Sequence, residues 1–189
     1  MSKSLEEIDA LVKKCQLCPL HESRAQAVPG EGNPNPDIVF VGEGPGQTED
    51  QTGRPFVGSA GKFLEELLGT IGMKREDVYI TNVVKCRPPN NRDPEPDEVN
   101  TCTTHYLIFQ LQILKPKLIC TLGRHAMAHF LPEDFKISSV HGKPYKRHGQ
   151  VYLPLYHPAA ALYHNALADT LKQDFKKIPR ILNKLYDRG

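Results

Sequence analysis

Four short apolar segments, separated by stretches with helical periodicity, constrain the fold of this chain more than any other feature. The run Asp37-Ile38-Val39-Phe40-Val41-Gly42 is continuously apolar between turn residues, which is typical of a strand buried on both faces. Similar runs occupy residues 77–84, 118–122 and 151–155. Strands that alternate with helices predict a parallel sheet covered on both sides. We therefore predict a three-layer α/β/α fold around a central four-stranded parallel sheet.

Caps and turn residues mark the expected helices and one hairpin. The segment Ser4–Glu7 matches a capping box that opens a first helix. Ser59 is predicted to be the N-cap of a second helix, and Pro96 to start a third. We expect a hairpin around residues 142–149 and a last helix whose apolar face runs from Leu167 to Ile178.

Length and charge limit the classes of protein to consider. A chain of 189 residues suits one hydrophobic core, so we predict a single domain over residues 1–189. The net charge of +2 does not by itself indicate a nucleic-acid-binding protein. The N-terminus lacks a signal-like apolar run, and no segment has the roughly 20 apolar residues of a membrane helix. We expect a cytoplasmic monomer that does not bind membranes.

Four of the five cysteines form a pattern that indicates a metal site. Cys15 and Cys18 make a Cys-x-x-Cys pair, and Cys86 and Cys102 follow with fifteen residues between them. Four thiolates can hold a zinc ion or a four-iron cluster, and the wide second spacing favours the cluster modestly. Four unrelated buried thiols are the third interpretation. Cys120 lies within an apolar run, so we expect it in the core.

The carboxyl ends of the predicted strands mark the expected ligand site, as in other parallel sheets. Three features fall there: the glycine-rich turn at residues 42–46, Asn82 and His157. The turn has neither the glycine spacing of a dinucleotide-binding loop nor the lysine of a P-loop. A nucleotide cofactor is therefore only weakly indicated.

Four motifs at these strand ends together resemble the fourth family of uracil-DNA glycosylases, the iron-sulfur branch. The resemblance covers Cys15 to about Phe175. The motifs are Gly42-Glu43-Gly44-Pro45-Gly46-Gln47-Thr48-Glu49-Asp50, Gly53-Arg54-Pro55-Phe56-Val57-Gly58-Ser59-Ala60-Gly61, Thr81-Asn82-Val83-Val84-Lys85-Cys86-Arg87-Pro88-Pro89 and His157-Pro158-Ala159-Ala160.

The resemblance implies a cofactor and a substrate pocket. A structural 4Fe-4S cluster would tie the N-terminal segment 1–36 to the rest of the chain, with four ligands: Cys15, Cys18, Cys86 and Cys102. A uracil flipped out of DNA would lie against six residues: Gly42, Glu43, Gly44, Phe56, Asn82 and His157. The implied activity is hydrolysis of the bond between uracil and deoxyribose, which leaves an abasic site.

The chemistry of uracil suggests a role for each side chain that the resemblance selects. The Asn82 amide can pair with uracil N3–H and O4 but leaves polar groups unpaired with cytosine. His157 can donate to O2 as negative charge gathers on the departing base, and Glu43 can orient the attacking water. Phe56 would stack on the base, although core packing is its alternative role. Glu49 is a weaker candidate for excluding the thymine methyl group, with a helix N-terminal or surface carboxylate as its alternative.

The expected partner is uracil-containing DNA, single- or double-stranded. The loop Ala159–Asn165 follows His157, as the minor-groove loop does in this superfamily, and its wedge is either Leu162 or Tyr163. Candidate phosphate contacts are the basic residues Arg87, Arg92, Lys143, Lys146 and Arg147.

Two other functions are weighed against this one. Some relatives trap themselves covalently on the abasic sugar, but they carry a histidine-bearing insert, and residues 88–98 contain no histidine. A non-catalytic iron-sulfur or zinc module would explain the cysteines. It would not explain why Glu43, Asn82 and His157 follow three different strands.

Overall fold

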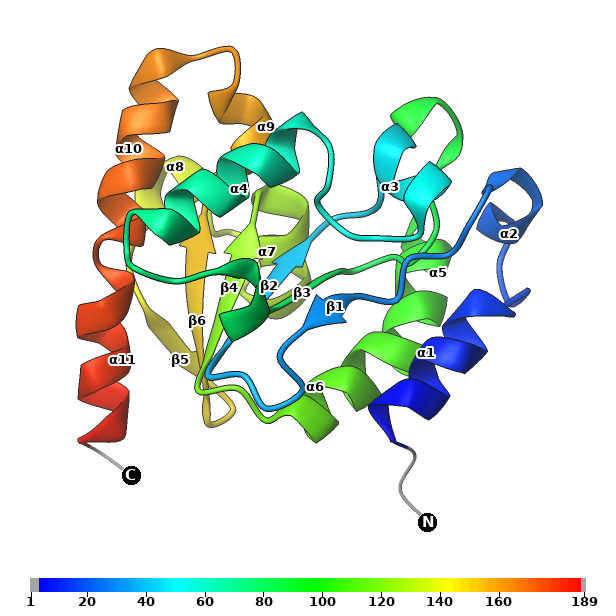
Figure 1. Cartoon of the computed structure of the whole chain (residues 1–189), viewed down its shortest axis with the longest axis horizontal. Coiled ribbons are helices and arrows are strands. Elements are labelled where there is room, and N and C mark those ends of the chain that lie inside the picture. Colours follow the sequence, from blue (N-terminus) through cyan, green and yellow to red (C-terminus); the bar gives the residue numbers. More distant parts are fainter. Residues whose placement is uncertain (1–3, 188–189) are drawn as a thin grey trace.

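A six-stranded sheet lies at the centre of the computed structural model, which describes residues 4–187 (Figure 1). Its strand order is β1-β3-β2-β4-β6-β5, and the four inner strands are mutually parallel. The predicted four-stranded parallel sheet is thus confirmed, in a larger sheet with an antiparallel strand at each edge. The strands are β1 (Glu31–Gly32), β2 (Ile38–Gly42), β3 (Tyr79–Asn82), β4 (Leu118–Leu122), β5 (Tyr145–Arg147) and β6 (Gln150–Leu155).

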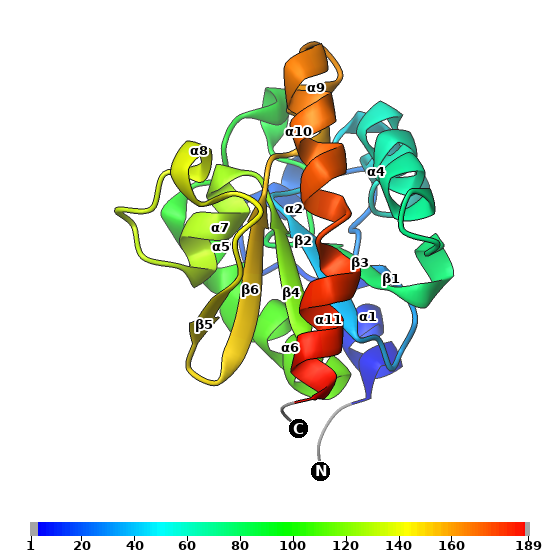
Figure 2. The same ribbon diagram turned by 90° about the vertical axis from the view of Figure 1, so that its left-hand side faces the viewer.

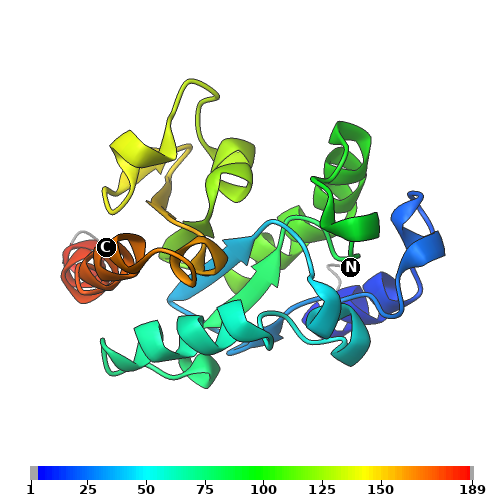
Figure 3. The same ribbon diagram turned by 90° about the horizontal axis from the view of Figure 1, so that it is seen from above.

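One face of the sheet is covered by helices from the middle and the end of the chain. Phe40 of β2 and Cys120 of β4 point to this face and are fully buried, as the apolar run around Cys120 predicted. Alternate residues of a strand point to opposite faces, so each inner strand contributes to both cores. Figure 3 shows the covering helices together on one side of the sheet: α4 (Ser59–Gly69), α9 (Pro158–Ala161), α10 (Asn165–Phe175) and α11 (Ile178–Tyr186).

The opposite face carries the N-terminal helix and the helices between β3 and β6. Val39 and Val41 of β2 pack here against apolar side chains of α1 and α6. A π-helical turn at Thr103–Leu107 joins α5 to α6. The helices on this side are α1 (Leu5–Lys13), α2 (Leu20–Ser23), α5 (Pro96–Cys102), α6 (Ile108–Leu114), α7 (Arg124–Phe130) and α8 (Ile137–Val140).

Local sequence signals placed several boundaries well and some wrongly. Ser4 caps α1 in a reciprocal capping box with Glu7, and Pro96 is the first residue of α5, both as predicted. Ser59 is wrong as an N-cap, because it is already helical and Gly58 precedes it without a side-chain cap. The expected last helix is two helices, since α10 ends at Phe175 and α11 begins at Ile178.

The β5–β6 hairpin forms where the sequence predicted a hairpin, and Figure 2 shows it at one edge of the sheet. His148 and Gly149 form its turn, and both have positive φ, 48° and 83°. Two-residue turns of this kind match the right-handed twist of the strands they join. No helix within residues 4–187 combines the length and the apolar character needed to span a membrane.

Asp174 connects the C-terminal helices to the segment before β5. This aspartate on α10 is buried, and its two oxygens bind different side chains. Oδ2 lies 2.6 Å from His141 Nδ1, and Oδ1 accepts from Lys177 Nζ at 2.7 Å. Buried carboxylates are stable only with such partners.

We predict that Asp174→Ala lowers the free energy of unfolding by about 2 kcal/mol, because it removes two charge-assisted hydrogen bonds and leaves His141 without its partner. Urea denaturation followed by circular dichroism measures this change. Lys177→Ala is the matched control and should cost less, because the Lys177 side chain is half exposed. Equal stability of Asp174→Ala and the parent protein would contradict the prediction.

Candidate active site

The register of β2 and β3 brings the two central motifs together at the carboxyl end of the sheet. Gly42 pairs directly with Asn82, and the contact continues beyond the strands, where Val84 N donates to Glu43 O at 3.0 Å. The turn to α3 (Gln47–Thr52) and the start of α9 lie at the same end of the sheet (Figure 1). They enclose a cavity of about 220 Å3 lined by Glu43, Gly44, Pro45, Gly46, Glu49, Phe56, Ala60, Asn82, Pro88, Asn91, Arg92, His157 and Ala159.

Asn82 lines this cavity and carries an unused hydrogen-bonding group. Its side chain is 1% exposed, and its Oδ1 has no hydrogen-bond partner among the described residues. An unpaired buried polar atom costs about 1–3 kcal/mol, so such atoms usually serve a ligand or a special structural purpose. Gly42 makes room for this group, because a Cβ there would lie 2.5 Å from Asn82 Oδ1.

Phe56 forms an aromatic wall of the cavity. Its ring is buried and lies 5.6 Å from the ring of His157, centroid to centroid, at an interplanar angle of 29°. Its backbone has φ 50°, in the left-handed region, which costs a residue other than glycine about 1–3 kcal/mol. The contacts that offset this strain come from residues distant in sequence, so its placement is set by tertiary structure.

His157 has a defined tautomer. Its Nδ1 accepts the backbone N–H of Ala159 at 3.1 Å, so this nitrogen carries no proton. The proton of the neutral ring is therefore on Nε2. Burial lowers the pKa of His157 to about 4, with Glu49 opposing the shift. At neutral pH the ring is an uncharged N–H donor beside the cavity.

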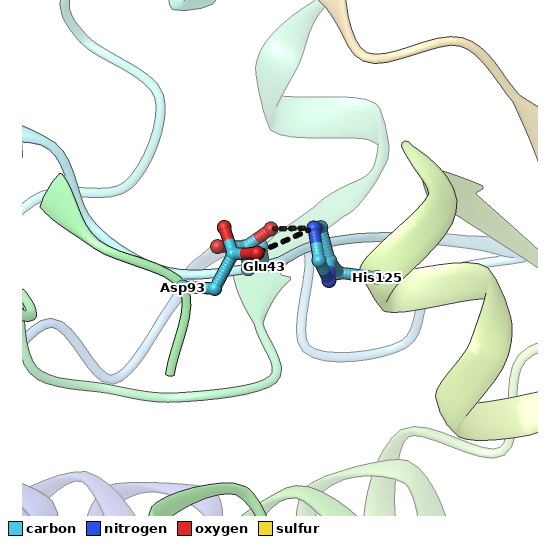
Figure 4. Close-up of side chains that lie close together, drawn as sticks. All are labelled: Glu43, Asp93 and His125. Carbon is cyan, nitrogen blue, oxygen red and sulfur yellow. Dashed lines mark ion pairs between the residues drawn. The ribbon is translucent and has the colours of Figure 1, made fainter. Parts of the chain in front are cut away.

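Glu43 contacts two residues that sequence reasoning did not select. Figure 4 shows the carboxylates of Glu43 and Asp93 on the ring of His125, with Nε2 at 3.6 Å from Glu43 Oε2 and 3.3 Å from Asp93 Oδ2. Burial raises the pKa of Glu43, as Asp93 also does, whereas His125 and Arg124 oppose the increase. His125 follows β4, so the end of a fourth parallel strand was the signal that could have identified it.

Two further turn residues have structural constraints of their own. A Cβ at Gly44 would lie 2.8 Å from Val84 Cγ2, so the turn offers only backbone at this position. Glu49 lines the cavity, but its Oε1 accepts the backbone N–H groups of Val57 and Gly58 at 2.9 and 2.8 Å. This carboxylate therefore binds the start of α4, which fits its alternative role as a helix N-terminal carboxylate.

The four cysteines of the predicted metal site line one small cavity with Arg24 and Lys85. Arg24 donates to Cys86 Sγ at 2.9 Å, and the backbone N–H of Lys85 donates to Cys102 Sγ at 3.3 Å. Burial raises the pKa of Cys102 to about 12, so its thiolate needs a positively charged partner.

The spacing of these sulfurs is wider than one zinc ion requires. Within residues 4–187, no three of the cysteine sulfurs lie mutually within 4.8 Å. Tetrahedral zinc with Zn–S bonds of ~2.3 Å would bring them to about 3.8 Å. The donor set of four thiols and three N–H groups directed at sulfur, from Leu17, Arg24 and Lys85, suits a larger cluster.

The candidate DNA contacts fall in two places. Arg92 lines the main cavity and binds Glu98 through both terminal nitrogens, and Arg87 lies near it, bound to Asn91. The three others are not brought to the cavity: they are Lys143, Lys146 and Arg147, in or just before the β5–β6 hairpin. The candidate wedges follow α9, where Leu162 is 41% exposed and Tyr163 is 85% exposed.

Comparison with known proteins agrees with this geometry. Residues 29–183 match the uracil DNA glycosylase superfamily. The chain is 51% identical to the type-4 uracil-DNA glycosylase of Sulfurisphaera tokodaii, over 93% of this chain and 83% of that protein. It is 49% identical to the type-4 enzyme of Archaeoglobus fulgidus, over 96% and 95% of the two chains. Identity to the type-5 uracil-DNA glycosylase of Thermus thermophilus is 34%, over 77% and 72%.

Identity is thus higher, and coverage broader, for these type-4 relatives than for the type-5 relative. This chain therefore belongs to the uracil DNA glycosylase superfamily and, within it, to the type-4 family.

Proposed function

We propose that this protein is a uracil-DNA glycosylase, which hydrolyses the N-glycosidic bond of uracil in DNA and leaves an abasic site. One observation carries the proposal: Asn82, whose buried Oδ1 has no hydrogen-bond partner among the described residues, lines the same cavity as a neutral His157. A carboxamide and an imidazole N–H are the groups that a uracil ring needs for its N3–H, O4 and O2 atoms.

Asn82 accounts for selection of uracil over cytosine. Its Oδ1 would accept uracil N3–H and its Nδ2 would donate to O4. Cytosine has an acceptor at N3 and an amino donor at C4, so both contacts would become repulsive or unpaired. Buried sites built around such hydrogen bonds discriminate by ~10⁴ or more. Phe56 would stack on the extracted base and replace part of the stacking lost from the DNA, about 1–3 kcal/mol.

His157 and Glu43 account for bond cleavage. The bond between N1 and C1′ breaks, and its electron pair leaves with uracil. His157 Nε2–H would donate to O2, where the developing negative charge concentrates. Water adds to C1′ and gives up a proton, and the Glu43 carboxylate is the group beside the cavity that can orient this water and accept the proton. Because His157 stays neutral, it stabilises the leaving base by donating a hydrogen bond from Nε2–H, and its protonation state need not change.

A 4Fe-4S cluster would be held by Cys15, Cys18, Cys86 and Cys102, and bound there it would supply a covalent tie between segments distant in sequence. Arg24 and the Lys85 backbone N–H donate hydrogen bonds to two of the sulfurs, and such bonds orient the ligands of metal sites. The role of the cluster in this proposal is structural.

DNA would approach the cavity beside α9. The exposed Leu162 and Tyr163 can enter the space that the flipped base leaves, and Arg87 and Arg92 lie close enough to the cavity to contact phosphates. A covalent binder of abasic DNA is the rival within the superfamily. It would leave an adduct that survives denaturing electrophoresis, whereas a hydrolase releases free uracil.

We predict that Asn82→Ala and His157→Ala each reduce uracil release about 100-fold or more, because each removes a hydrogen bond made to the reacting base. The assay uses a uracil-containing oligonucleotide, alkaline cleavage and a length readout under single-turnover conditions. Asn183→Ala, an exposed change on α11, is the matched control and should retain full activity. Parent-level rates in both site variants, with folding verified by circular dichroism, would contradict the assignment.

We predict that the His157 ring titrates near pH 4, well below the usual value of about 6.5. The folded chain therefore binds a proton on this ring less readily than the unfolded chain does. The free energy of unfolding is not reduced by this group above about pH 6.5, and it decreases as the pH falls from 6.5 toward 4. Ring-proton shifts in NMR spectra measure the titration, with His157→Ala providing the assignment. Between pH 5 and 6.5, protonation of His157 should not lower the rate of uracil release, because the ring stays mostly neutral in this range. A titration near pH 6.5 would contradict the proposed neutral donor.

We predict that the purified protein is brown and contains about four irons per chain. Cys86→Ser or Cys102→Ser should lose most of the iron, because both sulfurs line the cysteine cavity. Cys120→Ala is the matched control and should keep it, since Cys120 lies in β4 within the core. Iron and sulfide analysis and the visible spectrum give the result. One zinc per chain without iron would refute the cluster.

A further inference from the structure

We propose that Arg75 is a positioning residue for the base-stacking Phe56, and that its ion pair with Glu31 fixes the aromatic wall of the pocket. The inference rests on the proposed function, because it assigns Phe56 to contact with the base. It goes beyond that function by naming residues outside the cavity lining that determine how well the pocket holds uracil.

Arg75 binds the carbonyl oxygens of the two peptide groups that flank the Phe56 Cα. Its Nη1 donates to Phe56 O at 2.7 Å, and its Nη2 donates to Pro55 O. Phe56 has φ 50°, so these bonds are made only while the residue keeps its left-handed conformation. A planar guanidinium can satisfy two such carbonyls at once, which a lysine ammonium at the end of a flexible chain does not reproduce.

Glu31 holds the guanidinium in place. Its Oε1 accepts from Arg75 Nε at 2.5 Å, and Arg54 binds the same carboxylate at 2.8 and 3.0 Å. Although burial raises the pKa of Glu31, hydrogen bonds from Arg54 and Arg75 bring it below its ordinary value, so the carboxylate is charged at neutral pH. The Arg75 side chain is only 15% exposed, which limits competition from water.

The elements that carry these residues are fixed to the same sheet. Glu31 lies on β1 and pairs with Ile80 of β3. Arg75 lies in the 3-10 turn Arg75–Asp77, immediately before β3. The ion pair therefore relates the loop carrying Phe56 to the strand carrying Asn82, and these two side chains would contact the face and the edge of the same base.

Gly61 closes the remaining space around the Phe56 carbonyl. A Cβ at this position would lie 1.8 Å from Phe56 O, so backbone packs directly against it. The carbonyl lies between the backbone of α4 and the guanidinium of Arg75. Loss of the guanidinium would leave the strained peptide without its main hydrogen bonds, and relaxation of φ would move the ring away from His157, now 5.6 Å distant.

The test uses Arg75→Lys and Glu31→Gln in the full, metal-replete chain. We expect the dissociation constant for free uracil, measured by calorimetry, to rise about tenfold in Arg75→Lys and less in Glu31→Gln, as partial loss of base stacking requires. Affinity for DNA with an abasic site should stay unchanged, because phosphate contacts remain. In single-turnover kinetics the weaker base contact should appear as a lower rate on uracil-containing DNA.

Lys74→Ala is the matched control, because it removes a neighbouring positive charge that is 78% exposed and touches neither Glu31 nor Phe56. A crystal structure of Arg75→Lys should show Phe56 outside the left-handed region, and this readout tests the inference even if the parent protein proves inactive on uracil. Unchanged uracil affinity in both folded variants, or Phe56 retaining φ near 50°, would overturn it. A parent protein that releases no uracil would instead reject the proposed function.

Discussion

The pairing of Gly42 with Asn82 at the ends of two parallel strands is the constraint on which the pocket depends. A side chain at position 42 would lie 2.5 Å from the Asn82 amide and 2.6 Å from the Phe56 ring, so both groups approach the strand only because it carries no Cβ there. Strand register is an all-or-none property, since a shift of one residue turns every side chain to the opposite face. The apolar cores on both sides of β2 specify that register, and the position of the amide follows from them. The proposed recognition of the base would in this sense be a consequence of how the hydrophobic core is packed.

The groups that surround the cavity also share an electrostatic design. Asn82 and His157 are uncharged donors and acceptors, and the ionisable Glu43 lies beside His125 and Asp93. A cationic histidine would bind an anionic leaving group more strongly, but burial disfavours that charge, and the hydrogen bond from Ala159 N–H requires an unprotonated Nδ1. In the proposed mechanism, the ring would thus stabilise charge only as it develops during cleavage. Preorganised neutral donors of this kind act on the transition state more than on the bound substrate.

Features that depend on local pattern could be predicted from the sequence, and features that depend on distant contacts could not. The parallel strands, the capping box at Ser4 and the hairpin at His148–Gly149 follow from hydrophobic runs, caps and turn residues. Asn82 and His157 can be selected as candidates because the ends of parallel strands are known ligand positions, and both line the cavity. The edge strand β1 has two residues and no apolar pattern, and Glu31 gains its partners Arg54 and Arg75 only after folding. The end of α10 was missed because its apolar face continues directly into that of α11, so periodicity shows no break.

The segment from Asn82 to Cys86 belongs to both the pocket and the cysteine cavity, which gives a physical reason for their proximity. Lys85 is fully buried, and its Nζ donates to the Asn82 carbonyl at 2.8 Å and to Thr81 Oγ1 at 2.6 Å. Its backbone N–H donates to Cys102 Sγ. Burial lowers the pKa of Lys85 to about 8, an effect that negative charge on Cys102 opposes. As thiolate ligands of the proposed cluster, Cys86 and Cys102 would therefore favour the ammonium form of Lys85, which makes the hydrogen bonds at the end of β3. An anionic sulfur site at Cys86 and Cys102 would in this way stabilise the backbone that carries the base-reading amide, although no cysteine touches the pocket.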